Sequence, residues 1–142
     1  MAQATLVETQ MKDGQRLLDR LRQEGIAVTA AGWVKESDSG DWYLYLATPL
    51  VGEDDVATPA YRRVLAVIRE MEKEGFEMDP FEIKAIGPHD PIAKALTAQR
   101  DGRRARTPTW FGGSRLGELA VEAAYIYPPA ANPEEAAGVS KR

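Results

Sequence analysis

Apolar residues recur at three- and four-residue spacing along residues 7–24, with charged residues between them. This spacing places the apolar side chains on one face and predicts an amphipathic helix. Gly25 is a natural end for it, because glycine accepts the left-handed backbone that closes many helices. Gly14 weakens the middle of the stretch, so the helix could instead start there with Asp13 as its N-cap.

A second helix is predicted for residues 58–74, which carry the clearest helical pattern in the chain. Thr58 is a suitable N-cap, Pro59 fits the first turn, and Gly75 ends the pattern. The apolar face expected to pack on a sheet is formed by Tyr61, Val64, Leu65, Ile68 and Met71.

Strand patterns occupy the regions between and after these helices. Residues 26–35 and 42–48 form a predicted hairpin, since the first alternates, the second is rich in aromatic residues, and turn-forming residues separate them. Residues 81–86 also alternate and predict a third strand. The helix at 58–74 would connect the second and third strands if these run parallel.

The last third of the chain continues this mixture. Asp90 and Pro91 repeat the combination of cap and proline, and predict a short helix to about residue 99. Residues 107–111 predict a fourth strand, with a turn at 112–114. The last strand is predicted at 118–127. Its expected common face is formed by Leu119, Val121, Ala123, Tyr125 and Tyr127.

This order of elements predicts a single α+β domain over residues 1–127, built as a two-layer sandwich. Two hairpins, and helices that do not strictly alternate with strands, favour a mainly antiparallel sheet of about five strands with the helices on one face. Residues 128–142 are rich in proline and alanine and lack an apolar pattern, which predicts a disordered tail.

Composition narrows the class of protein. The 142 residues are 44% hydrophobic and 28% charged, close to the averages of globular domains. Cysteine is absent, which excludes disulfides, thiolate metal sites and thiol nucleophiles. Residues 1–10 lack the features of a signal peptide, and no apolar run approaches the roughly 20 residues of a membrane span. We therefore expect a cytoplasmic protein that does not bind membranes.

Positive charge is concentrated in residues 99–115, which hold five arginines and one acid. That local charge of +4 leaves −8 for the rest of a chain whose net charge is −4. Arginine pairs with phosphates or carboxylates, and tryptophan can stack on a base. The alternative is a solvated loop that pairs with the chain's own acids. The predicted anion- or partner-binding patch is formed by Arg100, Arg103, Arg104, Arg106, Arg115 and Trp110.

His89 is the only histidine and the side chain best suited to acid–base chemistry or metal binding. Parallel second and third strands would bring it near the acidic loop 53–55, at a sheet edge where open α/β sheets often bind ligands. The favoured interpretation is a loop histidine beside a helix cap, because a metal site needs several ligands. Residues 112–117 match no nucleophile elbow, dinucleotide fingerprint or P-loop. We expect no catalytic residue, no metal and no cofactor.

Four runs carry a resemblance that covers most of the chain outside the tail. They are AAGW at 30–33, WYLYLATPLV at 42–51, YRR at 61–63 and EAAYIY at 122–127. They are similar to a group of small uncharacterised bacterial proteins. The resemblance implies a bacterial cytoplasmic protein and no particular activity.

These features favour a non-enzymatic protein-interaction module, or an accessory subunit of a larger intracellular assembly, whose partner is another protein. One alternative is a nucleic-acid-binding accessory protein that uses residues 100–115. The other is a small-molecule sensor or enzyme that uses His89 and the acidic loop 53–55. The acidic remainder of the chain would repel a polyanion, which favours the protein partner over nucleic acid.

Overall fold

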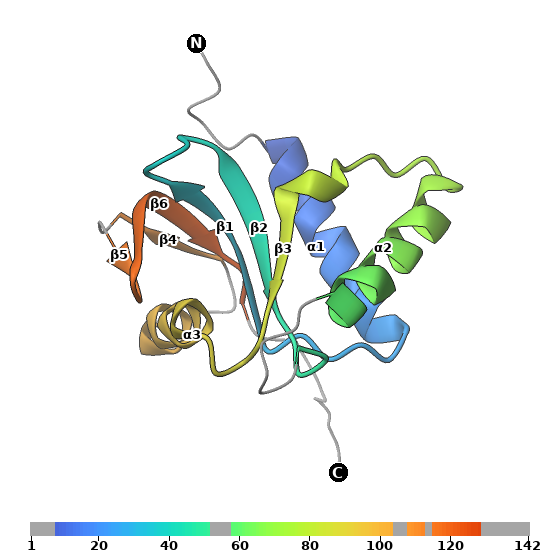
Figure 1. The fold of residues 1–142 in the computed structure, drawn as a ribbon. Coiled ribbons are helices and arrows are strands. Elements are labelled where there is room, and N and C mark those ends of the chain that lie inside the picture. Colours follow the sequence, from blue (N-terminus) through green and yellow to red (C-terminus); the bar gives the residue numbers. More distant parts are fainter. Residues whose placement is uncertain (1–7, 52–57, 104–107, 113–114, 129–142) are drawn as a thin grey trace.

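The computed structural model describes residues 8–51, 58–103, 108–112 and 115–128 (Figure 1). The acidic loop 53–55, the arginines at 104 and 106, and nearly all of the predicted tail lie outside these residues. In chain order the elements are α1 (Glu8–Gln23), β1 (Ala30–Glu36), β2 (Trp42–Ala47), α2 (Thr58–Glu72), the 3-10 turn η1 (Pro80–Glu82), β3 (Ile83–Ile86), α3 (Pro91–Arg103), β4 (Thr109–Phe111), β5 (Arg115–Leu116) and β6 (Leu119–Ile126).

The strands form one open sheet in the order β3-β2-β1-β6-β4, and β5 pairs with β6 beside this path. β1 and β2 make the predicted hairpin, in which Ala30 lies opposite Ala47 and Lys35 opposite Trp42. β6 runs antiparallel on the other side of β1. β3 runs parallel to β2, which is the condition under which α2 was expected to connect them. The α+β class and the mainly antiparallel sheet are confirmed.

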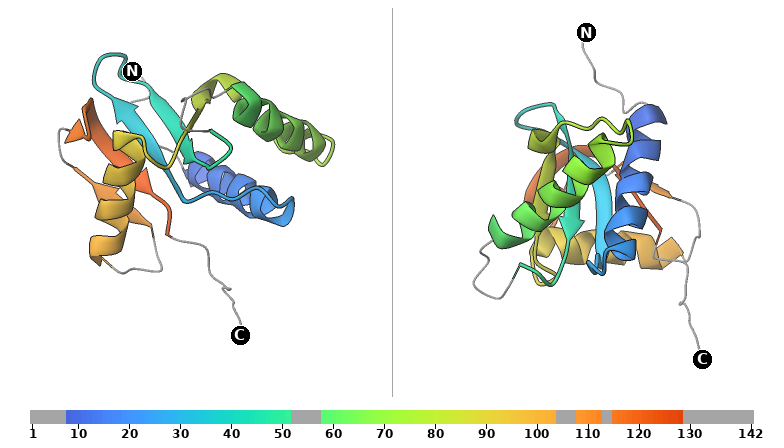
Figure 2. Two further views of the ribbon diagram at one scale, coloured as in Figure 1. Left: turned by 60° about the horizontal axis from the view of Figure 1, so that its bottom comes forward. Right: turned by 90° about the vertical axis from the view of Figure 1, so that its right-hand side faces the viewer.

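Helices cover both faces of the sheet (Figure 2). On one face, Leu18 of α1 and Ile68 of α2 pack in a cluster that contains Trp33. On the other face, Leu96 of α3 packs in a second cluster that contains Val34. The expected placement on one face therefore holds for α1 and α2 but not for α3. The sequence carried a sign of this, because residues 30–34 form a continuous apolar run, and a strand buried on both faces has that pattern.

A shift in strand pairing divides the predicted face of β6 in two. The register between β1 and β6 shifts at Lys35 and Glu36, which is typical of a β-bulge. Tyr125 consequently packs with the cluster under α1 and α2, whereas Leu119 and Val121 pack with the cluster under α3. Alternation by itself could not locate this change of face.

Three helix predictions are also refined. α1 runs through Gly14 rather than starting there. In α2, Val64 and Ile68 are buried, but Leu65 is only half-buried and lies at the side of the packed face. α3 continues past residue 99 to Arg103. None of the helices in the described part of the chain is both long and apolar enough to cross a membrane.

Candidate functional site

Aromatic rings form a row on the sheet face that α1 and α2 share. The ring of Trp110 meets the rings of Tyr125 and Trp42 edge-on, with centroids 4.9 Å and 6.5 Å apart. Tyr125 in turn meets Tyr127 edge-on at 5.4 Å. Such pairs contribute about 0.5–1.5 kcal/mol each beyond the area they bury. Trp110 nevertheless remains 52% exposed. The neighbouring rings of this aromatic row therefore hold a large, solvent-exposed ring in a defined position.

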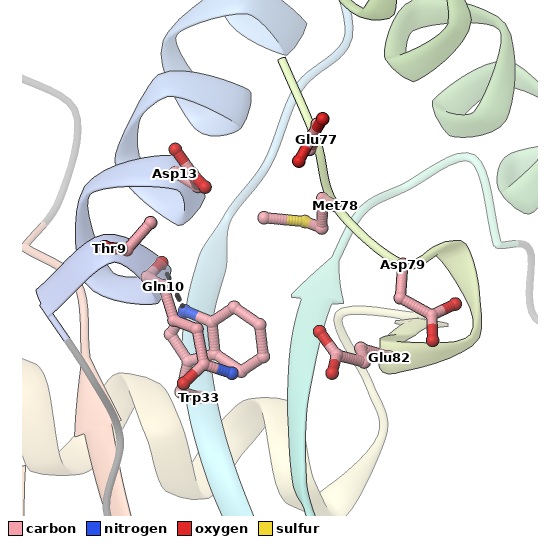
Figure 3. Close-up of a pocket in the computed structure, with 8 residues that line it drawn as sticks. All are labelled: Thr9, Gln10, Asp13, Trp33, Glu77, Met78, Asp79 and Glu82. Atoms are coloured by element: carbon pink, nitrogen blue, oxygen red, sulfur yellow. Dashed lines mark hydrogen bonds between the residues drawn. The ribbon is translucent and has the colours of Figure 1, made fainter.

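A pocket of about 330 Å³ lies next to the aromatic row, between α1 and the segment after α2 (Figure 3). Trp33 connects the two features, because it lies at the floor of the pocket and is the cross-strand partner of Tyr125. Met78 and Glu82 point toward the space between the two walls (Figure 3). The residues that line the pocket are Thr9, Gln10, Asp13, Trp33, Glu77, Met78, Asp79 and Glu82.

The floor of the pocket is held by a short hydrogen-bond network. The indole N–H of Trp33 donates to the Gln10 carbonyl at 3.2 Å and to the Tyr127 hydroxyl at 3.1 Å. The Tyr127 hydroxyl donates to the Met11 carbonyl at 2.6 Å, and burial raises the pKa of this hydroxyl. α1 can approach so closely because Gly14 has no side chain: a methyl group there would lie 2.1 Å from the Tyr127 oxygen. The first turns of α1 are thereby fixed to the sheet.

Four carboxylates line the pocket: those of Asp13, Glu77, Asp79 and Glu82. The Asp13 carboxylate lies 3.7 Å from the Arg16 guanidinium. The Asp79 carboxylate accepts a 2.9 Å bond from the backbone of η1. Glu77 and Glu82 have no hydrogen-bond or ion-pair partner among the described residues. The pocket therefore has a negative potential that its own surroundings offset only in part.

Burial, together with repulsion from Asp79 and Asp41, raises the pKa of Glu82. Removing a carboxylate from water and placing it beside others disfavours its charged form. The folded protein therefore carries an electrostatic cost at this position, and a cation beside Glu82 would relieve it.

The described members of the predicted arginine patch lie at separate places. The Arg100 guanidinium, in the last turn of α3, donates to the Thr29 carbonyl at 2.8 Å. Arg115 donates to the Glu118 carbonyl at 3.0 Å within the β5–β6 turn. That turn packs against Pro91, the first residue of α3. The nine-residue separation between Pro91 and Arg100 corresponds to about 14 Å along a helix.

Trp110, the aromatic member of the predicted patch, contacts rings on the sheet face opposite α3. Arg103 ends α3, and Arg104 and Arg106 lie outside the described residues. The structure thus does not bring Arg100, Arg115 and Trp110 into one cluster. An anion-binding use of the whole segment stays a prediction.

His89 is exposed in the turn between β3 and α3. The next residue, Asp90, accepts a 2.8 Å bond from the Ile92 N–H, as an N-cap does. His89 thus lies beside a helix cap, as the loop interpretation expects. Within the described ranges, no three His, Asp or Glu side chains are grouped so that they could hold a metal ion.

Sequence reasoning missed the pocket because its walls are far apart along the chain. The one local signal was the run at 77–82, EMDPFE, which holds three acids next to an exposed aromatic residue, Phe81. The contact of this run with α1 and Trp33 exists only in the folded chain.

The chain matches no protein-family model, no curated protein and no solved structure. The resemblance to small bacterial proteins therefore stays a prediction.

Proposed function

We propose that this protein is a non-enzymatic protein-interaction module, an accessory subunit that docks a partner protein on the aromatic row. One observation carries the proposal: Trp110 is 52% exposed although two neighbouring rings hold it in place. Rigid aromatic side chains lose little conformational entropy on binding, and tryptophan is enriched among the residues that dominate interface energies.

A protein partner fits this face better than a nucleic acid. Trp110 could stack on a base, but phosphates placed along the aromatic row would lie close to the carboxylates of the adjacent pocket. Arg100 and Arg115 give this face no compensating charge, because both donate to backbone carbonyls elsewhere. Nucleic-acid binding through residues 100–115 is therefore the alternative, and the experiment must distinguish it from binding of a protein.

Affinity capture from the cell that makes the protein, with quantitative mass spectrometry, tests the proposal. The variant is Trp110→Ala, and the matched control is Leu50→Ala, another exposed apolar residue that lies beyond the opposite end of β2. We expect the wild type and the control to retain the same protein partner and Trp110→Ala to lose it. Unchanged melting curves would show that the loss is not due to unfolding.

Two outcomes would contradict the proposal. One is a partner retained equally by all three proteins, which would place docking elsewhere. The other is capture that nuclease treatment abolishes and that depends on Arg103 and Arg104, which would favour the nucleic-acid alternative.

A further inference from the structure

The pocket and the aromatic row lie on the same side of the sheet and differ in their chemistry. Trp33 lies at the floor of the pocket and pairs across the sheet with Tyr125, whose ring centroid is 4.9 Å from that of Trp110. The row is apolar and ends in an exposed ring, and the pocket carries four carboxylates beside Met78. A ligand that covers both must combine apolar surface with positive charge.

We propose that the pocket receives a lysine or arginine side chain from a basic segment of the partner protein, and that the residues flanking this side chain lie along the aromatic row. This inference rests on the proposed docking function and specifies the partner's chemistry.

The shape of such a side chain suits the pocket. Lysine and arginine bury an apolar stem while keeping a charged head at the end. The stem would lie along Met78, and the head would reach Glu82 and Asp79. Binding sites for small molecules usually measure about 300–1,000 Å³, so a pocket of about 330 Å³ suits one long side chain rather than a large ligand.

Among the described residues, the positive charges near the pocket oppose this binding but are fewer than the carboxylates. Thr9 and Gln10 belong to the first turn of α1, whose backbone has the positive end of the helix dipole, equivalent to roughly half a charge. The Arg16 guanidinium lies 3.7 Å from Asp13 and also over the ring of Phe76, 5.1 Å from its centroid. Asp41 adds negative potential, because it acts on Glu82 in the same direction as Asp79.

Short blocked peptides with one central arginine provide the probe, and the same peptides with citrulline provide the control. Citrulline keeps the length and planarity of the side chain but removes its charge. Binding to the full chain is followed by the NMR signals of the indole N–H groups of Trp33, Trp42 and Trp110. We expect saturable shifts with the arginine peptide that weaken with added salt, and little change with the citrulline peptide.

Substitutions in the pocket then test whether its carboxylates bind the charged side chain of the peptide. Glu82→Gln combined with Asp79→Asn keeps the side-chain shapes, and asparagine remains a good cap for η1. We expect the Kd for the arginine peptide to rise roughly tenfold or more. The control is Glu70→Gln, which removes an exposed carboxylate of α2 that pairs with Lys73, and it should leave the Kd unchanged.

Equal binding of both peptides, no binding of either, or a Kd insensitive to the pocket substitutions would overturn the inference. Shifts of the same indole signals by an oligonucleotide instead of the arginine peptide would also overturn it. If capture still depends on Trp110 but the arginine peptide does not bind, only the basic partner is wrong. If the peptide binds through the pocket but no protein is captured, the cation site stands and the docking function fails.

Discussion

Two half-buried carboxylates show how differently the two regions beside this sheet are built. Glu36 accepts a 2.5 Å bond from the Tyr45 hydroxyl, which packs on the α3 side, and a 2.7 Å bond from the Lys84 ammonium. Burial, and then the bond to Glu36, raise the pKa of Tyr45. Glu82, at the pocket, has no such partner in the described part of the chain, and burial, followed by repulsion from other carboxylates, raises its pKa.

The contrast distinguishes a carboxylate that belongs to a structural hydrogen-bond network from one whose charge has no partner in the described structure. A buried polar network stabilises a protein when its members are satisfied, whereas an unpaired polar group costs free energy. Glu36 belongs to the first class, and its lysine also lies over the Tyr43 ring, 4.2 Å from the centroid. Glu82 belongs to the second, at a position that faces a pocket.

The largest effect is expected in the core on the pocket side of the sheet. Ile68 is 1% exposed and fixes α2 over the sheet. Ile68→Ala should lower the free energy of unfolding by about 2–5 kcal/mol, measured by chemical denaturation. Leu65→Ala is the matched change on the same helix and should cost clearly less, because Leu65 is half-buried. Equal losses would show that the two residues share one core.

The wall of the pocket can be tested at Gly14. In an exposed helix, replacing glycine with alanine stabilises by roughly 1 kcal/mol. Here the new methyl group would meet the Tyr127 hydroxyl, so Gly14→Ala should instead destabilise by about 1–3 kcal/mol. Lys12→Ala, at an exposed position of α1, serves as the control. A more stable Gly14→Ala protein would mean that α1 is not held against Tyr127.

The same substitution at the two carboxylates should have opposite effects on stability. Glu36→Gln weakens two charge-assisted bonds and should lower the free energy of unfolding by about 1–2 kcal/mol at neutral pH. Glu82→Gln removes an unpaired charge and should raise it slightly, while weakening the binding of a basic peptide. Losses of equal size would show that Glu82 is satisfied like Glu36.

The pH dependence of Glu82→Gln gives a sharper form of this test. Folding raises the pKa of Glu82, so the folded state holds its proton more tightly than the unfolded state. The free energy of unfolding therefore falls as pH rises from the unfolded pKa, about 4.3, to the folded one. Thermal melting should find the variant equal to wild type below that range and more stable above it. A constant difference at all pH values would contradict the assigned cause.

The smallest effect is expected at Arg115, whose guanidinium bonds a carbonyl only three residues away. Arg115→Ala should change the free energy of unfolding by no more than about 0.5 kcal/mol, as for most exposed positions. Peptide binding at the acidic pocket should also stay the same. A marked loss of binding would place Arg115 in the docking surface and would support the predicted patch in which the arginines of residues 100–115 act together.

Local patterns in the sequence determined most of the secondary structure. Helical spacing, a cap and a proline predict α2, and alternation with turn residues between predicts the β1–β2 hairpin, because these signals lie within one element. The parallel pairing of β2 and β3 was one possibility that the sequence left open, and the structure shows it.

Only the tertiary structure decided which faces the elements share. The residues of α3 themselves do not indicate its side of the sheet, although the apolar run of β1 indicated burial on both faces. The bulge opposite Lys35 places part of β6 on the other face. The aromatic row and the pocket join residues 9–13, 33, 77–82, 110 and 125. Contacts between such distant segments depend on strand order and packing, so local periodicity determines the elements but not the surface they build together.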